Sequence, residues 1–257
     1  MTIINQRNVE RALADCRWVK RILTYESIGS TMDKARELGS EGSPEATIVV
    51  AAQQTEGRGR LSRPWLSPDG SLSFSILLYP PPEKLVSLTM MAGLAVARAV
   101  EATASLKVDL KWPNDILIGD KKVAGILVES GFNGQRQYVV IGIGVNVNLD
   151  SARYSEIAHI ATSLSLESGD EVDILRLLRE LIFGLETLYT DFDAAGLYNA
   201  WRGRLTTLGC RVRAVTGDGT IDGVAEDVAD DGTLIIRTDD GHSHTIIAGD
   251  VMLRHVA

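Results

Sequence analysis

Cysteine is scarce in this chain: its 257 residues include two, Cys16 and Cys210, which lie far apart and outside any Cys-x-x-Cys pattern. This spacing argues against both a disulfide-stapled fold and a thiolate zinc site. Long apolar runs are missing too, because polar residues interrupt the most apolar segment, 85–100. We expect that segment to be too short and too polar to span a membrane. The first 18 residues show no signal-peptide pattern, so we expect a cytoplasmic protein.

Positive charge is also in deficit, since 26 Lys and Arg stand against 34 Asp and Glu, a formal net charge of −8. A chain that coats itself with nucleic acid or an anionic membrane surface is normally basic. The balance argues against both kinds of partner, but it allows a local basic cluster to hold a small anion. With 45% hydrophobic and 23% charged residues, the composition is that of an ordinary globular protein.

The order of the periodic segments predicts two domains. Strands come in runs rather than in strict alternation with helices, which favours an α+β main domain. We expect strands at 21–25, 47–53, 71–79, 106–112 and 137–146, a hairpin at 115–128, and helices at 8–18, 31–38, 83–103, 173–189 and 192–205. Ser30 is the expected N-cap of helix 31–38, and Gly39 is its expected stop.

Short strands separated by Asp-Gly turns follow residue 208, and the last is expected at 251–256. This texture is typical of a small antiparallel barrel or sandwich. We therefore divide the chain into a domain 1–207 and a domain 208–257. His242 and His244 alternate within one of these strands and have no acidic or thiol partner at ligand spacing, so we expect surface histidines and no metal pair.

Three arginines crowd into one glycine-rich loop, where Arg58, Arg60 and Arg63 follow Gly57 and Gly59 closely. Guanidinium groups match phosphate and carboxylate oxygens, and glycines let the backbone approach a ligand. Three like charges this close repel one another, so we expect the loop to be mobile until an anion arrives. Taken alone, the cluster fits a solvated basic turn or a nucleic-acid segment equally well, although the overall acidity counts against the latter.

Two further motifs point to a ligand. In Lys-Trp-Pro-Asn-Asp, at 111–115, the proline ends a strand and places Asn114 and Asp115 at a corner. The hairpin that follows carries Lys122, which needs an anion if its strand is buried and is otherwise an exposed turn lysine. Ile-Gly-Ile-Gly-Val-Asn-Val-Asn, at 141–148, lacks the third glycine and the helix of a dinucleotide fingerprint. A strand with small residues against a ligand is the better interpretation.

In order and spacing, QTEGRGRLSRPW, KWPNDI…GDKKVAGIL and GIGVNVN resemble the biotin protein ligases over about residues 21–257. Ser-Thr at 30–31 and Ala-Thr-Ser-Leu at 161–164 match the same pattern. The resemblance implies a class II synthetase-like catalytic domain with a mixed sheet and helices, followed by a small SH3-like β-barrel. It also implies ATP-dependent transfer of biotin, through biotinyl-5′-AMP, to a lysine of a biotin carboxyl carrier protein.

The resemblance assigns roles to individual residues. Lys122 should bridge the biotin carboxylate and the α-phosphate, and Arg58 and Arg60 should close over the adenylate. Asp115 should orient or deprotonate the acceptor lysine, with capping of the turn as the alternative. The implied biotin contacts are Ser30, Thr31, Gln54, Arg58, Gly59, Arg60, Trp112, Lys122 and Gly125. The implied ATP contacts are Arg58, Arg60, Arg63, Asn114, Lys122 and Asn146; Mg²⁺ accompanies ATP, with ligands unknown.

The chain departs from the family pattern in places: Met32 stands where Asn usually follows Ser-Thr, and Leu61, Ser62 and Pro64 replace residues that are often Gly, Arg or Lys. Some members repress transcription through an N-terminal winged helix. Twenty residues before the first expected strand are too few for such a domain, so we expect a monofunctional enzyme with no nucleic-acid partner.

Two other functions remain as alternatives at this stage: a lipoate–protein ligase and a non-catalytic biotin-binding regulator. The arginine loop together with Lys-Trp-Pro-Asn-Asp favours biotin over lipoate, and the intact Lys122 and arginine cluster favour an enzyme. A homodimer formed through a sheet edge is left open.

Overall fold

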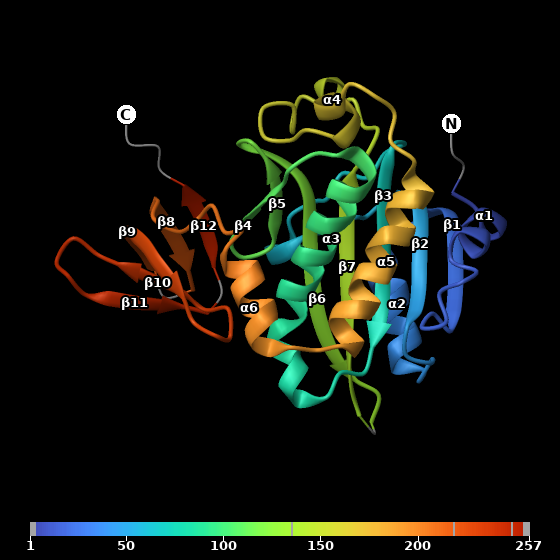
Figure 1. Ribbon diagram of the computed structural model, residues 1–257, viewed down its shortest axis with the longest axis horizontal. Coiled ribbons are helices and arrows are strands. Elements are labelled where there is room, and N and C mark those ends of the chain that lie inside the picture. The colour runs from blue at the N-terminus through green and yellow to red at the C-terminus, as the bar shows by residue number, and fades with distance from the viewer. Residues whose placement is uncertain (1–3, 135, 218, 248, 254–257) are drawn as a thin grey trace.

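The computed structural model describes residues 4–134, 136–217, 219–247 and 249–253, which form two units, each built on one sheet (Figure 1). The larger sheet consists of β1 (Arg21–Ile28), β2 (Thr47–Gln54), β3 (Ser71–Leu78), β4 (Asp109–Lys111), β5 (Asp115–Ile118), β6 (Lys121–Phe132) and β7 (Gln137–Asn146). The smaller sheet consists of β8 (Arg211–Thr216), β9 (Gly219–Val228), β10 (Leu234–Arg237), β11 (Ser243–Ile246) and β12 (Asp250–Leu253). The helices are α1 (Gln6–Ala12), α2 (Thr31–Ser40), α3 (Leu88–Ala104), α4 (Leu164–Ser168), α5 (Ile174–Thr190) and α6 (Ala194–Arg202), with 3-10 turns η1 (Arg60–Ser62), η2 (Pro82–Ser87) and η3 (Ser151–Arg153).

The larger sheet is mixed, with strand order β1-β2-β3-β7-β6-β5-β4. Its β1 and β2 are parallel and joined through α2, whereas every other neighbouring pair is antiparallel. The smaller sheet is antiparallel throughout, in the order β11-β10-β9-β8-β12, as expected for a small barrel. The predicted α+β class is therefore confirmed.

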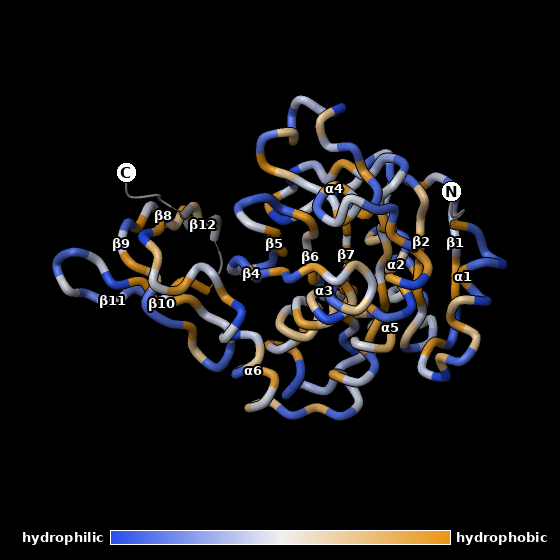
Figure 2. The backbone as a smooth tube through the Cα atoms, turned by 45° about the horizontal axis from the view of Figure 1, so that its top comes forward, coloured by the Kyte–Doolittle hydropathy of each residue, from blue (hydrophilic) through white to orange (hydrophobic). Residues whose placement is uncertain are grey.

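The two faces of the larger sheet are buried against different helices. On β3, Leu72, Phe74 and Ile76 point into the large core with α3 and α5, while Ser73 and Ser75 alternate with them and face the side of α2. Hydrophobic residues accordingly gather along the central strands and these helices, and the connecting loops are mostly hydrophilic (Figure 2). The polar face of β3 is the one available for a ligand.

Helix α2 begins as predicted and ends later than predicted. The Ser30 hydroxyl accepts a hydrogen bond from the Asp33 amide (3.4 Å), which confirms the N-cap. The helix continues through Gly39 to Ser40, and the left-handed residue is Gly42 (φ +76°), so the predicted stop was wrong. Gly39 is needed for packing instead, because a Cβ there would lie 2.7 Å from the Tyr138 ring.

The long apolar segment is the central helix of the core. By length and composition alone, Pro82–Ala104 could cross a membrane, contrary to our expectation for this stretch. In the fold, 67% of its most apolar window is buried. The segment starts with the 3-10 turn η2 and becomes α-helical at Leu88. An apolar surface on nearly every side is what a helix packed between a sheet and α5 requires.

Three further elements are shorter than predicted. The helix expected at 8–18 is Gln6–Ala12. The strand expected at 106–112 is limited to Asp109–Lys111, because its sheet partner β5 offers only Asp115–Leu117 for pairing. The helix expected at 192–205 is Ala194–Arg202. The strand expected at 251–256 can be followed to residue 253; the rest of it lies outside the described residues.

Hydrogen bonds tie the smaller unit to the larger one. The indole nitrogen of Trp112, which is buried, donates to the Gly232 carbonyl (2.8 Å), and the Tyr198 hydroxyl donates to the Val228 carbonyl (2.7 Å). Trp112 directly precedes the Pro113 turn of the second motif. The position of this turn is therefore coupled to the smaller unit.

Candidate active site

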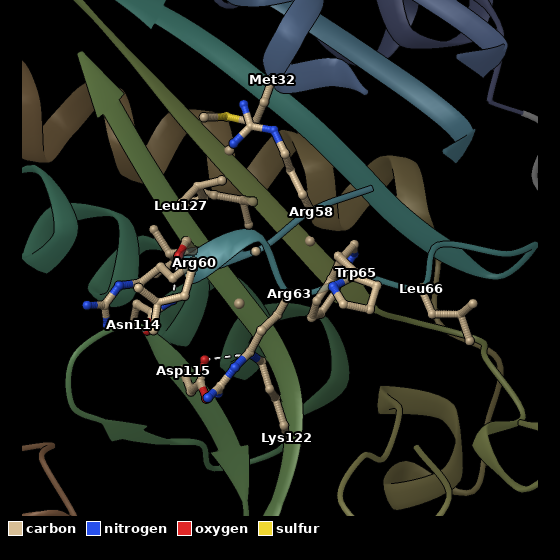
Figure 3. A pocket seen from close by; sticks show the side chains of 18 of the residues that line it. Met32, Arg58, Arg60, Arg63, Trp65, Leu66, Asn114, Asp115, Lys122 and Leu127 are labelled. Carbon is tan, nitrogen blue, oxygen red and sulfur yellow. Dashed lines mark hydrogen bonds and ion pairs between the residues drawn. The ribbon is translucent and has the colours of Figure 1, made fainter. Parts of the chain in front are cut away.

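A cavity of about 310 Å³ opens on the α2 side of the larger sheet (Figure 3). Each of the residues predicted from the sequence as a site residue lines it, although they come from six separate segments: Ser30, Thr31, Gln54, Arg58, Gly59, Arg60, Arg63, Trp112, Asn114, Asp115, Lys122, Gly125 and Asn146. The cavity also has lining residues that our prediction missed, among them Trp65, Lys111, Gly142 and Gly144. The smaller unit contributes Gly249 and Val251.

One row of paired residues crosses the whole sheet, and its part from β7 to β4 forms the floor of the cavity. From β1 to β4, each strand contributes one member: Tyr25, Ala51, Ser73, Gly144, Gly125, Asp115 and Lys111. Residues paired in this way project from the same face of a sheet. Four members line the cavity, and the two nearest β3, Gly144 and Gly125, are glycines, so this part of the floor is bare backbone.

The glycines are required by what lies above them. A Cβ on Gly144 would lie 2.5 Å from the indole nitrogen of Trp65, and one on Gly125 would lie 3.1 Å from the Lys122 ammonium nitrogen. The first distance is too short for a real side chain, whereas the second is tight and would require the Lys122 ammonium group to shift. The sequence signal for Gly144 was present in the Gly-Ile-Gly motif, but the residue that it accommodates is 79 positions away.

At one end of the cavity, a polar network fixes Thr31 and Gln54. The Thr31 amide and hydroxyl both donate to Oε1 of Gln54 (2.8 and 3.0 Å), and the Thr31 hydroxyl contacts that of Ser75 (2.9 Å). With Oε1 engaged, the Gln54 amide nitrogen is left to donate to a ligand. Met32 is buried beside this network, against Gly142. This end therefore combines apolar packing with a small number of oriented hydrogen-bonding groups.

Arg58 is paired with carboxylates of the protein itself. Its guanidinium donates two hydrogen bonds to Glu129 on β6 and one to Asp33 on α2 (2.9 Å). The expectation that repulsion leaves this loop arginine waiting for an anion was wrong, because two acidic residues neutralise it. These bonds raise the pKa of Arg58 and lower the pKa of Glu129 below its usual range. We call this cluster, Arg58 with Glu129 and Asp33, the clasp.

The backbone of the arginine loop folds back on itself. The Trp65 amide donates to the Gly57 carbonyl (2.8 Å), and the Gly59 amide donates to the Arg63 carbonyl (2.8 Å). Leu61 and Ser62 at its tip are both left-handed (φ +54° and +56°), a conformation that favours glycine. Leu61 is 70% exposed. Two of the departures from the family pattern, Leu61 and Ser62, thus sit where the backbone is strained.

The other two arginines extend along the cavity. Arg60 donates to the side-chain oxygen Oδ1 of Asn114 (3.3 Å), and the side-chain nitrogen of Asn114 in turn donates to the Ile126 backbone carbonyl (2.7 Å). Figure 3 shows Arg63 pointing toward Asp115 and Lys122. Arg60 therefore holds the arginine loop against the turn at residues 113–115. Arg63 points toward the end of the cavity that is farther from Thr31.

Lys122 lies near the centre of the site. Its ammonium group forms an ion pair with Asp115 (2.6 Å) and lies 5.3 Å from the centroid of the Trp65 ring. Its backbone amide donates to the Ile160 carbonyl (2.8 Å), and the Thr162 amide donates to the Lys122 carbonyl (2.9 Å). These bonds fix the strand, so that a half-buried ammonium faces the cavity in a set position. Such a group can neutralise two anions that must approach each other.

Asn146 is the last residue of β7 and also lines the cavity. It is 3% exposed, and its amide nitrogen donates to the Thr162 carbonyl (3.0 Å). This leaves its side-chain oxygen as an acceptor toward the cavity. Among the described residues, no group of three or more side chains has the composition of a metal site.

Known proteins share both units of this structure. Residues 25–146 match the model of the biotin/lipoate A/B protein ligase family, and residues 207–254 match that of the biotin protein ligase C-terminal domain. The bifunctional ligase/repressor BirA of Bacillus spizizenii is 39% identical over 230 residues, which cover 86% of this chain and 71% of the relative. The biotin–[acetyl-CoA-carboxylase] ligase of Paracoccus denitrificans is 34% identical over 81% of this chain and 90% of the relative.

This chain belongs to the biotin protein ligase family. Among solved structures, the Aquifex aeolicus biotin protein ligase in complex with biotin and ATP superposes with a TM-score of 0.75. That match covers 91% of this chain and 99% of the Aquifex chain at 30% identity. The biotin protein ligase fold and the family predicted from the sequence motifs are therefore confirmed.

Proposed function

We propose that the cavity is where this biotin protein ligase joins biotin to ATP and then transfers biotin to a lysine of a carboxyl carrier protein. The enzyme class, its substrates biotin and ATP, and the biotinyl-5′-AMP intermediate follow from family membership and from the Aquifex complex. The observation that carries the assignment of the site is Lys122, set beside Asp115 over a floor of bare backbone.

In the first step, a biotin carboxylate attacks the α-phosphate of ATP, and pyrophosphate leaves. Both reacting groups are anionic, so positive charge must already be in place where they meet. We assign this task to Lys122, with Arg60 beside it on the arginine loop. The biotin head would lie at the Thr31 and Gln54 end, with Ser30, Gly59 and Gly125 in the wall. Trp112 follows Lys111 at the opposite end and its indole is buried in the large core, so we assign it no contact with biotin. Asn114 and Asn146 would face the nucleotide.

Arg58 takes a different part from the one that the family resemblance implies. Because Glu129 and Asp33 already neutralise its guanidinium, we propose that it holds the loop closed and acts on the ligands through its neighbours. A closed loop shields the mixed anhydride from water and from premature hydrolysis. The positioning role falls to Arg58, and direct contact with the phosphates falls to Arg60 and Arg63.

In the second step, the acceptor lysine must lose a proton before it attacks the anhydride. Asp115 is the one carboxylate among the described residues that line the cavity. When Lys122 turns to the adenylate phosphate, Asp115 becomes free to accept a hydrogen bond from the incoming ammonium. We therefore propose Asp115 as the group that orients and deprotonates the acceptor.

Mg²⁺ enters as part of the nucleotide substrate. This ion keeps several waters and uses one or two carboxylates together with substrate phosphates. A single lining carboxylate, Asp115, fits an ion that ATP brings with it better than a preformed protein site. ATP chemistry of this kind is in keeping with the cytoplasmic location that we propose. We also propose a catalytic domain 1–207 and a β domain 208–257, which the two family matches at 25–146 and 207–254 support.

The decisive experiment is ATP–pyrophosphate exchange by the purified protein, with biotin compared with lipoate. We expect exchange that depends on biotin, because the adenylate forms reversibly. Exchange with lipoate alone would overturn the assigned substrate. No exchange with either acid would favour the non-catalytic biotin-binding regulator instead.

The clasp gives a second expected result, which concerns pH. Since the Glu129 pKa is lowered, its share in loop closure is complete above the ordinary carboxyl pKa of 4.5 and is lost as the pH falls through the lowered folded value. The rate at which bound biotinyl-5′-AMP is released should therefore stay constant down to about pH 5. Glu129→Gln should raise that rate about tenfold at neutral pH, since it removes a charge-assisted pair.

The matched control for the clasp is Glu37→Gln. Glu37 also lies in this region of the structure, but it pairs with Lys34 on the exposed side of α2 and does not touch Arg58. Glu37→Gln removes the same charge as Glu129→Gln but leaves the clasp intact, so it should leave adenylate release unchanged. Equal effects of the two variants would contradict the role of the clasp.

A further inference from the structure

Lys111 is a cation of the cavity for which neither the sequence motifs nor the first step has a use. It is the last residue of β4, paired with Asp115 in the floor row. Its neighbour Leu110 is buried in the large core, where its side chain faces Gly93. Since side chains alternate along a strand, Lys111 projects from the opposite face, into the cavity that it lines.

The ammonium group of Lys111 has no partner within the described parts of the chain: no ion pair and no side-chain hydrogen bond joins it to another residue. Its neighbours in the cavity differ in this respect. Lys122 is paired with Asp115, Arg58 with Glu129, and Arg60 with Asn114. Lys111 is half-buried, and a half-buried cation without a counter-charge favours an anionic ligand.

The place of Lys111 in the floor row indicates which anionic group it binds. Strands in a sheet are about 4.8 Å apart, so Lys111 lies about 19 Å from Ser73, four strands away along the row. The proposed biotin head lies at the Ser73 and Ser75 end, beside Thr31. Lys122, on β6, stands between the two ends. A ligand group that extends beyond Lys122, on the side away from biotin, therefore reaches Lys111.

The chemistry of the first step fixes what must extend there. The biotin carboxylate oxygen forms a bond to the α-phosphorus, and the bond from that phosphorus to the bridging oxygen of the β-phosphate breaks. The bonding electrons go to the bridging oxygen, and pyrophosphate leaves with them. The entering and leaving oxygens lie roughly in line through phosphorus. An attack that comes from the β3 side therefore drives pyrophosphate toward β5 and β4.

We propose that Lys111 binds the β- and γ-phosphates of ATP and the pyrophosphate that leaves. The inference rests on the proposed function of the cavity. Arg63, which points to the same end, would share the charge (Figure 3). Lys111 then stabilises negative charge that grows on the leaving group, and it has no part in the transfer of biotin to the acceptor.

The test separates the two half-reactions. In ATP–pyrophosphate exchange, Lys111→Gln should raise the KM for pyrophosphate and for ATP about tenfold, the size expected for one charged hydrogen bond. The KM for biotin should change by less than about twofold, and so should the rate of transfer from preformed biotinyl-5′-AMP to the carrier protein. Lys111→Arg, which keeps the charge, should recover most of the pyrophosphate KM.

The matched control is Lys107→Gln, which removes the same charge from an exposed residue just before β4. The proposal is overturned if Lys111→Gln gives the same pyrophosphate KM as Lys107→Gln, or if it slows transfer from preformed adenylate as much as it slows exchange. Either result leaves the ligase assignment standing, provided that wild-type exchange depends on biotin. Wild-type exchange that is independent of biotin would overturn the proposed function itself.

Discussion

Replacing Lys122 with alanine is expected to slow the formation of biotinyl-5′-AMP by about two to three orders of magnitude, the range seen when a preorganised electrostatic donor is lost. The loss is larger than that of a simple contact, because Lys122→Ala also leaves Asp115 without its partner at 2.6 Å. An unpaired carboxylate then faces two anionic substrates. Burst formation of the adenylate in single-turnover mixing measures the rate directly.

Two variants make this expectation specific. Lys121, the preceding residue, is exposed, so Lys121→Ala removes a lysine from the same hairpin and should leave the rate unchanged. Combining Lys122→Ala with Asp115→Asn should bind ATP more tightly than Lys122→Ala alone, since the added repulsion is gone. Adenylate formation by Lys122→Ala at a rate within about threefold of wild type would refute its bridging role.

Gly144→Val is expected to weaken biotin binding by at least about a hundredfold, because a β-branched side chain there would occupy the space of the Trp65 ring and of the ligand. The strand cannot retreat, since β7 lies at the centre of the sheet and pairs with β3 and β6 on its two sides. Isothermal titration calorimetry with biotin gives the affinity. Gly144→Ala, with one added carbon 2.5 Å from the indole, should show a smaller loss in the same direction.

The control for Gly144 lies three residues away. Ile141 occupies the same strand, points into the large core and does not line the cavity, so Ile141→Val disturbs β7 without changing the cavity. It should lower the free energy of unfolding by about 1 kcal/mol and leave the biotin affinity unchanged. Biotin binding by a folded Gly144→Val protein at wild-type strength would show that the floor row does not form the biotin site.

Much of the cavity could be predicted from the sequence, because its residues occur in short local motifs. Gly125, Asn146 and the Ser30 cap are examples, since a turn, a strand end or a capping pattern marks each one. The same local signals placed a helix stop at Gly39, which fails because Gly39 makes room for Tyr138, a residue 99 positions away. The local sequence therefore indicated correctly that a glycine is required at position 39, but only the packing against Tyr138 shows the reason.

The clasp shows the limit of such reasoning more clearly. The spacing of Arg58, Arg60 and Arg63 predicts repulsion among them, because spacing alone does not reveal their acidic partners. Glu129 lies 71 residues after Arg58, and Asp33 lies 25 residues before it, so no local pattern joins them. Lys111 was present in the second motif but received no role, because only the pairing of β4 with β5 places it beside Asp115 on the cavity floor.

The floor row also bears on how such an enzyme can change its substrates. Since each position along the floor row belongs to a different strand, the sites that we propose for the acyl group and the nucleotide are built from segments far apart in the sequence. Substitutions in α2, β2 and β3 can alter the acid that is accepted while the phosphate end stays intact. Acyl and nucleotide specificity can therefore diverge independently, and a library confined to residues 30–32, 54 and 73–75 is the economical route to a ligase for a new acid.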